Sequence, residues 1–275
     1  MNSVKRPVAL VTGASAGIGK SIVKQLQQDG WKVYGAARRV EAMRDIEKEG
    51  ASVLALDVTD DQSMQTCIDT IIQQEGQIDA LVNNAGYGSY GTVEDVDIDE
   101  ARRQFEVNVF GLARLTQLVL PHMREANQGR IVNISSMGGR IWMPVGGWYH
   151  ATKYCVEVLS DALRLETKPF GIHVSVIQPG AIESEWSGIA ADNLKKTAKT
   201  SPYQKIVQAM VNALTNYDSA SKPEVIAKAV SKALNSKKPK RRYAAPFDAK
   251  ALIFLHWIMP DRIWDRFIMM ALKAS

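Results

Sequence analysis

A single doubly wound α/β domain is the fold class that the sequence predicts, and three observations predict it. Short apolar runs alternate with longer amphipathic segments along most of the 275 residues. Runs such as Val8–Val11 are apolar on both faces, as strands of a parallel sheet covered on both sides must be. A glycine-rich turn follows that first run directly and opens a helix pattern. Together these features predict a mostly parallel sheet of about seven strands with helices on both faces.

Each expected element rests on its own pattern of apolar residues. Strands are predicted where apolar residues run together, and helices where they recur every three or four positions. The expected strands are Val8–Val11, Lys32–Ala37, Ser52–Leu56, Ile78–Val82, Arg130–Ile134, His173–Ile177 and Arg242–Ala245. The expected helices are Gly17–Gln28, Val40–Glu49, Asp61–Glu75, Glu100–Arg124, Tyr149–Lys168 and Glu224–Asn235. The domain is expected to span residues 1–246, with an irregular substrate loop at about 184–222 and a C-terminal extension at 247–275.

The composition excludes several classes of protein. The chain is 46% hydrophobic and 23% charged, which excludes a disordered tail and a collagen-like fibre. Its net charge of +5 comes from one run, Lys237–Arg242, which holds five basic residues. The rest of the chain has 29 basic and 29 acidic residues. A single run is not a basic face, so no nucleic-acid partner is expected.

Cysteine usage and hydropathy predict a cytoplasmic protein without a metal site. Cys67 and Cys155 are too few for a disulfide framework and fit no metal-ligand spacing. Met1–Pro7 has no secretory signal pattern before the first strand. The apolar stretch Ala251–Met259 is nine residues long, whereas a membrane-spanning helix needs about 20.

The glycine-rich turn predicts a phosphate site. Its sequence, Thr-Gly-Ala-Ser-Ala-Gly-Ile-Gly from Thr12 to Gly19, places Gly13, Gly17 and Gly19 between a strand and a helix. Glycines allow a tight turn and a close approach of the backbone to a pyrophosphate, which the N–H groups of the helix N-terminus then bind. A glycine-rich turn without a ligand remains the alternative for this motif taken alone.

The end of the second expected strand indicates the kind of dinucleotide. A free ribose 2′-hydroxyl usually meets an acidic residue about 20 positions after the glycines. Here Arg38 and Arg39 occupy that place, and no acidic residue follows before Glu41. A guanidinium group can donate two hydrogen bonds to one phosphate, and NADP(H) carries a phosphate at the ribose 2′ position. The two arginines therefore predict a preference for NADP(H), with the Ser15 hydroxyl as a further contact to that phosphate. The alternative is that one or both arginines are simply solvated.

Polar motifs follow three further expected strands. Asn83-Asn84-Ala85-Gly86 follows the fourth, Ser135-Ser136 the fifth, and Pro179-Gly180 the sixth. The carboxyl ends of parallel strands are where a doubly wound sheet binds its ligands. Tyr149 and Lys153 lie four positions apart on one helix face, so the ammonium can lower the phenol pKa and prepare the tyrosine for proton transfer. Ser136 would hold the substrate oxygen.

In combination, these motifs resemble the short-chain dehydrogenase/reductase family over about residues 7–243. The resemblance implies a Rossmann-type fold, Tyr149 as proton donor and acceptor, and Ser136 as the group that orients the carbonyl. It also implies that Lys153 binds the nicotinamide ribose and that Asn108 anchors a water in a proton relay. Within the family, the chain looks most like the hydroxysteroid/retinol dehydrogenase-like branch. The implied cofactor contacts are Gly13, Ser15, Gly17, Ile18, Gly19, Arg38, Arg39, Asp57, Val58, Asn83, Ala85, Gly86, Tyr149, Lys153, Pro179, Gly180, Ile182 and Ser184.

Aromatic and aliphatic residues near Tyr149 predict a hydrophobic substrate. They are Ile141, Trp142, Met143, Val145 and Trp148 before the tyrosine, and Trp186, Ile189 and Leu194 in the substrate loop. Such a lining suits a steroid-, retinoid- or lipid-like ketone or alcohol. The alternative is that these side chains fill the core or an oligomer interface.

The C-terminal extension leaves three roles open. Ile263, Trp264, Phe267, Ile268, Ala271 and Leu272 form one helical stripe. This stripe could cap the substrate cleft, join subunits or lie on a membrane surface.

The sequence therefore predicts an NADP(H)-dependent oxidoreductase that moves a hydride between the nicotinamide and a secondary alcohol or ketone. Two alternatives stay open: a non-catalytic NADP(H)-binding regulator, and the same fold acting as a dehydratase or isomerase. The family resemblance also implies a homodimer or tetramer joined through Glu100–Arg124 and Tyr149–Lys168.

Overall fold

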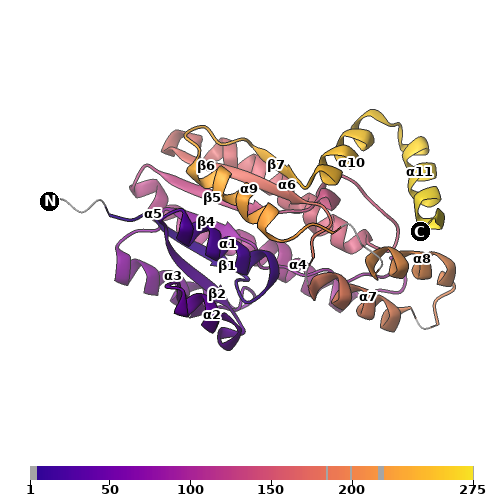
Figure 1. The fold of residues 1–275 in the computed structure, drawn as a ribbon, viewed down its shortest axis with the longest axis horizontal. Coiled ribbons are helices and arrows are strands. Elements are labelled where there is room, and N and C mark those ends of the chain that lie inside the picture. Colours follow the sequence, from indigo (N-terminus) through magenta and orange to yellow (C-terminus); the bar gives the residue numbers. More distant parts are fainter. Residues whose placement is uncertain (1–4, 184, 199, 216–219, 275) are drawn as a thin grey trace.

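The predicted parallel sheet is confirmed in the computed structural model, which describes residues 5–183, 185–198, 200–215 and 220–274. Seven strands pair in the order β3-β2-β1-β4-β5-β6-β7, and every pairing is parallel (Figure 1). The strands are β1 (Val8–Thr12), β2 (Lys32–Ala37), β3 (Ser52–Ala55), β4 (Ala80–Asn83), β5 (Gly129–Ile134), β6 (Ile172–Pro179) and β7 (Arg242–Ala245). The order reverses between β1 and β4, and this crossover is where a doubly wound sheet opens a crevice for a ligand.

Helices cover both faces of the sheet, as predicted. One face packs against α1 (Gly17–Gln28), α2 (Arg44–Lys48) and α9 (Glu224–Asn235). The other packs against α3 (Asp61–Glu75), α5 (Gly111–Glu125) and α6 (Gly147–Glu166). The 3₁₀ turn η1 (Val40–Met43) precedes α2, and the turns η3 (Met137–Gly139) and η4 (Lys168–Phe170) flank α6. The central strands are buried along their whole length because both faces are covered.

The single helix predicted over Glu100–Arg124 is interrupted. The chain forms α4 (Ile98–Phe105), a π-helical turn η2 (Glu106–Phe110) and then α5. A π turn holds one residue more than an α turn and often lies at a functional site. In this protein it contains the buried Asn108.

The prediction of an irregular stretch at about 184–222 is wrong over most of its length. Two helices occupy it, α7 (Glu185–Thr197) and α8 (Gln204–Thr215), and they pack against each other. Ala190, Ala191 and Leu194 of α7 are buried, as are Val207 and Met210 of α8. In α7, two of these buried residues are alanines, so the apolar periodicity of its sequence is weak, whereas α8 has a clear helical period that the sequence analysis missed.

The C-terminal extension forms two more helices, α10 (Phe247–Ile258) and α11 (Asp261–Ala274). Trp264, Ile268 and Leu272 recur every four residues on the buried side of α11. They join a third apolar cluster with α7, α8 and the segment before Tyr149. This cluster lies beyond the carboxyl ends of the strands, where α7, α8 and α11 gather at one end of the molecule (Figure 1).

Candidate active site

The glycine-rich turn is held in place by hydrogen bonds to the segment that follows β4. The Thr12 hydroxyl accepts hydrogen bonds from the Asn84 and Ala85 N–H groups at 3.0 and 2.9 Å. The Asn84 side-chain amide donates to the carbonyl oxygens of Thr12 and Gly13 at 2.9 and 3.3 Å. A Cβ atom on Gly19 would lie 2.2 Å from the Gly13 carbonyl oxygen, so only glycine fits there. The turn thus has the close backbone packing that a pyrophosphate site requires.

Arg38 and Arg39 lie at the end of β2, beside this turn. Both are exposed, and the Arg39 guanidinium donates to the Ser15 hydroxyl at 3.4 Å. Asp57, after β3, accepts two bonds from Thr59, from its N–H at 3.0 Å and its hydroxyl at 2.7 Å. Burial raises the Asp57 pKa, but the Thr59 bonds and the charges of Arg38 and Arg103 outweigh it, so the net shift is downward. Two exposed guanidinium groups and the Ser15 hydroxyl thus lie near the glycine turn at the end of β2, and guanidinium groups are good ligands for phosphate oxygens.

Ser136 and Tyr149 come together from different elements. Ser136 caps the turn η3, and its hydroxyl accepts a bond from the Gly138 N–H at 3.0 Å. Tyr149, in the first turn of α6, is 8% exposed, and its phenol is hydrogen-bonded with Ser136. The two hydroxyls that a carbonyl oxygen would meet are therefore already adjacent.

Lys153 and Asn108 complete the group. The Lys153 ammonium donates to the Ile134 carbonyl at 3.0 Å and lies 5.9 Å from the centre of the Tyr149 ring. The Asn108 amide donates to the Tyr87 carbonyl at 2.8 Å and to the Thr152 hydroxyl at 3.1 Å. Its oxygen accepts from the Tyr87 N–H at 3.0 Å. Asn108 is thus a buried residue that ties the loop after β4 to α6.

Burial dominates the protonation equilibria in this group. It raises the pKa of Tyr149 to about 12, against the lowering effect of the Ser136 hydrogen bond. It lowers the pKa of Lys153 to about 8, against the attraction of Glu157. The prediction that Lys153 lowers the pKa of Tyr149 is therefore wrong for the protein alone, where burial dominates and only the Ser136 hydrogen bond opposes it. A phenol with this pKa is protonated at neutral pH and can donate a proton.

Two of the remaining predicted contacts lie in the segment at the end of β4. The Asn83 side chain donates to Thr116 and Asn133 at 3.1 and 2.9 Å. A Cβ atom on Gly86 would lie 3.0 Å from the Asn108 side-chain oxygen and 3.6 Å from the Lys153 nitrogen.

The later predicted contacts follow β3 and β6. Val58 is buried against the start of α5. Pro179 ends β6, the Gly180 N–H donates to the Ala245 carbonyl at 2.8 Å, and Ile182 pairs with Ser221. Ser184 lies outside the described residues.

The side of Tyr149 that faces away from the glycine turn is apolar. Tyr90 is buried with its ring 5.6 Å from the Tyr149 ring, and Ile141, Val145 and Trp264 belong to the same cluster. A hollow of about 510 Å³ opens beside Val145, between the loop after β4 and the start of α8. Trp142 is 37% exposed, and of the predicted loop residues Leu194 is fully buried. The side chains of Trp186 and Ile189 lie outside the described residues.

Sequence reasoning missed three residues of the site. Thr12 and Asn84 stand inside motifs that were recognised, but only the structure shows that they join the two motifs. His150 follows Tyr149 and is buried between two loops, and nothing in the sequence marks it. Among the described residues, no group of three or more His, Cys, Asp or Glu side chains could hold a metal ion.

Comparisons with known proteins agree with this arrangement. A family model described as short chain dehydrogenase matches residues 7–195. A probable short-chain type dehydrogenase/reductase of Helicobacter pylori is 35% identical and covers 94% of this chain and 95% of its own length. An NADPH-dependent 3-dehydrocapnine reductase of Ornithobacterium rhinotracheale is 35% identical, covering 96% and 97%. The crystal structure of a short-chain dehydrogenase from Streptomyces avermitilis has a TM-score of 0.77 at 35% identity and covers 92% and 93%.

Proposed function

The chain belongs to the short-chain dehydrogenase family, and on this premise we propose that it is an NADP(H)-dependent reductase of hydrophobic ketones. It would oxidise the corresponding secondary alcohols in the reverse direction. One observation carries the proposal: the buried residues Asn108, Tyr149 and Lys153 and the half-buried Ser136 form one group beside the glycine turn.

The residues around the crevice fit a bound dinucleotide. Gly13 has φ +67°, and a Cβ atom there would lie 2.9 Å from Ala85, so the turn requires glycine at this position. Ser15, Arg38 and Arg39 would hold the 2′-phosphate, and Lys153 the nicotinamide ribose. Bound NADPH supplies the hydride. The name of the Ornithobacterium relative supports the same cofactor.

The protein's own groups supply the proton. Ser136 would donate a hydrogen bond to the substrate oxygen, next to the neutral Tyr149 phenol. As negative charge develops on that oxygen, the phenol gives up its proton. The Lys153 ammonium lies close enough to stabilise the resulting phenolate, which its neutral form could not do. Asn108 holds Tyr87 and Thr152 in place around this group, where the family resemblance puts a proton relay.

The two alternatives from the sequence are less well supported. A regulator that only binds the cofactor has no use for a buried lysine next to a buried tyrosine and a half-buried serine. Burying Lys153 disfavours its charged form. Such a group is retained where it does chemistry. A dehydratase or isomerase would use the same tyrosine, but it would not consume NADPH in proportion to product.

The substrate class rests on the apolar cluster beside Tyr149. We expect NADPH oxidation to be faster, per mole of enzyme, with ketones bearing long apolar chains than with small polar ketones. The assay is NADPH absorbance with a panel graded by chain length and polarity, including steroid, retinoid and long-chain ketones. A preference for small polar ketones would contradict the proposed class. The panel also tests the steroid- or retinoid-like preference, which stays a prediction from the sequence.

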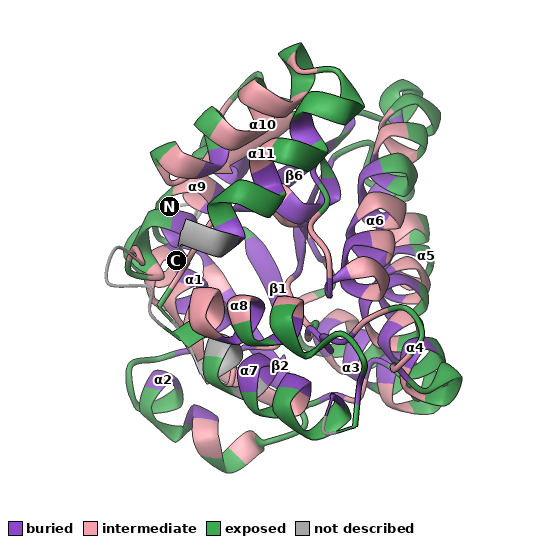
Figure 2. Ribbon diagram, turned by 90° about the vertical axis from the view of Figure 1, so that its right-hand side faces the viewer, coloured by how far each residue is buried: buried purple, intermediate pink, exposed green. Residues whose placement is uncertain are grey.

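The C-terminal helices support the role of a cap over the substrate cleft. The Trp264 indole N–H donates to the Trp142 carbonyl at 3.3 Å, and its ring packs edge-on against Trp142 and His256. The outward faces of α10 and α11 remain exposed (Figure 2), with Phe247 79%, Trp257 76% and Met270 65% exposed. No helix among the described residues is long and apolar enough to cross a membrane. Contact of these exposed faces with a membrane surface stays a prediction from the sequence.

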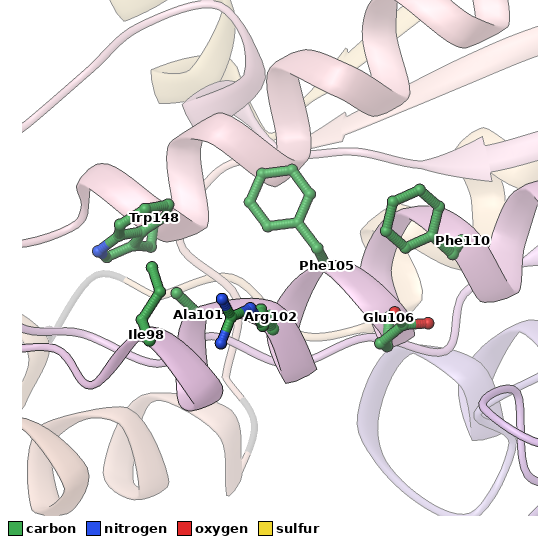
Figure 3. A pocket seen from close by; sticks show the side chains of 7 residues that line it. All are labelled: Ile98, Ala101, Arg102, Phe105, Glu106, Phe110 and Trp148. Atoms are coloured by element: carbon green, nitrogen blue, oxygen red, sulfur yellow. The ribbon is translucent and has the colours of Figure 1, made fainter.

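We further propose a homodimer formed through α4, η2 and α6. Phe110 is 56% exposed on η2, and Val158 and Leu165 are 67% and 63% exposed on α6. A hollow of about 240 Å³ lies beside Phe110 and is lined by residues of α4 and η2 and by Trp148. Figure 3 shows the side chains that line it. A second copy would cover this apolar surface.

Placing a charge on this surface should therefore separate the subunits. We expect Val158→Glu to convert the dimer to a monomer in light scattering, because the interface would then bury an unpaired carboxylate. Glu224→Gln, an exposed change on the opposite face of the sheet, is the control. A Val158→Glu variant that remains dimeric would show that the subunits meet elsewhere.

A further inference from the structure

His150 is the buried residue that the proposed chemistry does not use. It follows Tyr149 in the first turns of α6 and is 4% exposed. Its ring lies 5.8 Å from the Tyr149 ring at an angle of 61°. The His150 ring therefore packs beside Tyr149, and the proposed reaction does not use it.

Both ring nitrogens of His150 are hydrogen-bonded to backbone groups, one in η3 and one in the segment between η3 and α6. The Met143 N–H donates to Nε2 at 3.3 Å, and Nδ1 lies 2.9 Å from the Gly138 carbonyl oxygen. A backbone N–H can only donate, so Nε2 carries no proton. Nδ1 must then carry it and donate to Gly138. These contacts together specify one neutral tautomer.

The imidazole also fills a slot made by two glycines. A Cβ atom on Gly138 would lie 2.6 Å from Nδ1, and one on Gly146 would lie 2.8 Å from Nε2. Side chains at either position would displace the ring. The ring is thus held between the two ends of residues 138–146, which we call the substrate-side loop.

Each hydrogen bond of His150 reaches a different part of the site. On one side, Gly138 makes two hydrogen bonds: its carbonyl oxygen accepts from Nδ1, and its N–H, which belongs to the preceding peptide group, donates to the Ser136 hydroxyl at 3.0 Å. On the other side, Met143 stands in the part of the loop that contains Val145. Val145 has φ +68°, a conformation that is costly for a β-branched residue, and its carbonyl accepts from the Gly91 N–H at 2.8 Å.

We propose that His150 is a positioning residue with two separable tasks. Through Gly138 it orients the Ser136 hydroxyl toward the substrate oxygen, and through Met143 it holds the strained substrate-side loop against the apolar cluster. The inference rests on the proposed function, because it assigns His150 to the reduction that Ser136 and Tyr149 would perform.

Three substitutions separate the two tasks. His150→Asn places an amide near the position of Nδ1, so it can still donate to Gly138 but cannot reach Met143. His150→Gln reaches the position of Nε2 and can accept from Met143, but it loses the bond to Gly138. His150→Ala loses both. One hydrogen bond lost in a buried site corresponds to about a tenfold change.

The expected result is a split between the kinetic constants for ketone reduction. His150→Asn should raise KM about tenfold and leave kcat within about threefold. His150→Gln should lower kcat about tenfold and leave KM nearly unchanged. His150→Ala should show both defects. His173→Asn, an exposed histidine change on β6, is the matched control and should change neither constant.

Other patterns overturn the proposal. A His150→Ala variant with wild-type kcat and KM would overturn it. So would a fall in kcat in all three variants that matches the fraction of each variant that is no longer folded. Nitrogen-15 NMR of the imidazole at pH 7 gives an independent test, with the His150 signal identified by its absence in His150→Asn. A neutral ring protonated at Nδ1 is expected, and an Nε2-protonated ring or an imidazolium overturns the geometry. A wild-type protein that reduces no ketone refutes the proposed function alone, since the NMR test still decides on His150.

Discussion

Tyr149→Phe should abolish ketone reduction and leave NADPH binding almost unchanged. The substitution removes only the phenolic hydroxyl, which is the proposed proton donor beside Ser136. Losing a general acid typically costs 10²- to 10⁴-fold in rate, so kcat should fall by about 1,000-fold. The NADPH dissociation constant, measured by tryptophan fluorescence, should change less than about threefold, because the proposed role of that hydroxyl is to contact the substrate oxygen and not the phosphates.

Tyr154→Phe is the control for this experiment. Tyr154 lies five residues further along the same helix and is half-buried, but it has no place in the proposed proton transfer. Its variant should keep wild-type kinetics. If Tyr149→Phe retained more than about a tenth of wild-type turnover, the proton would have to come from another group.

The Arg38→Ala/Arg39→Ala double variant should lose its preference for NADPH. Each guanidinium contributes a charge-assisted hydrogen bond worth about 1.5–3 kcal/mol. Both arginines are exposed, so the lower figure applies. The dissociation constant for NADPH should therefore rise about 100-fold, whereas that for NADH, which lacks the 2′-phosphate, should change little.

The matched control is Arg44→Ala. Arg44 lies on the adjacent helix α2, is exposed and is paired with Glu41, so it offers no free charge to a phosphate. Wild-type dissociation constants for NADH and NADPH that differ less than twofold would contradict the assignment of the arginine pair. Salt dependence is a second check, because contacts between exposed charges weaken as ionic strength rises.

The sheet could be predicted because each strand can be identified from the apolar pattern of its own short stretch of sequence. Strands such as Val8–Val11 and Lys32–Ala37 are apolar on both faces, and only a sheet covered by helices on both sides satisfies that pattern. The glycine turn and the polar residues at the strand ends are also local sequence patterns, so the position of the ligand crevice could be predicted from them. Arg242–Ala245, predicted as the last strand, has these bounds in the structure.

The parts that could not be predicted depend on partners distant in sequence. Helix α7 is held by α8 and by apolar residues of α11, and its buried alanines carry little hydrophobic signal. Asn108 looks like a surface residue in a helix pattern, and it is buried only because a π turn directs it inward. His150 gains its role from two glycines that precede it in a loop, a fit that requires the folded backbone.

The π turn at Glu106–Phe110 has a consequence for how the two helices around it can vary. An α-helix advances by about 100° per residue, so one additional residue rotates everything that follows by that angle. The turn thus lets α4 present Ile98 at the exposed hollow while α5 directs Leu115 and Val119 into the core. Deleting one residue here would favour a straight helix and rotate α5 relative to α4. The π turn therefore sets the angle by which the exposed side of α4 is rotated from the side of α5 that faces the interior.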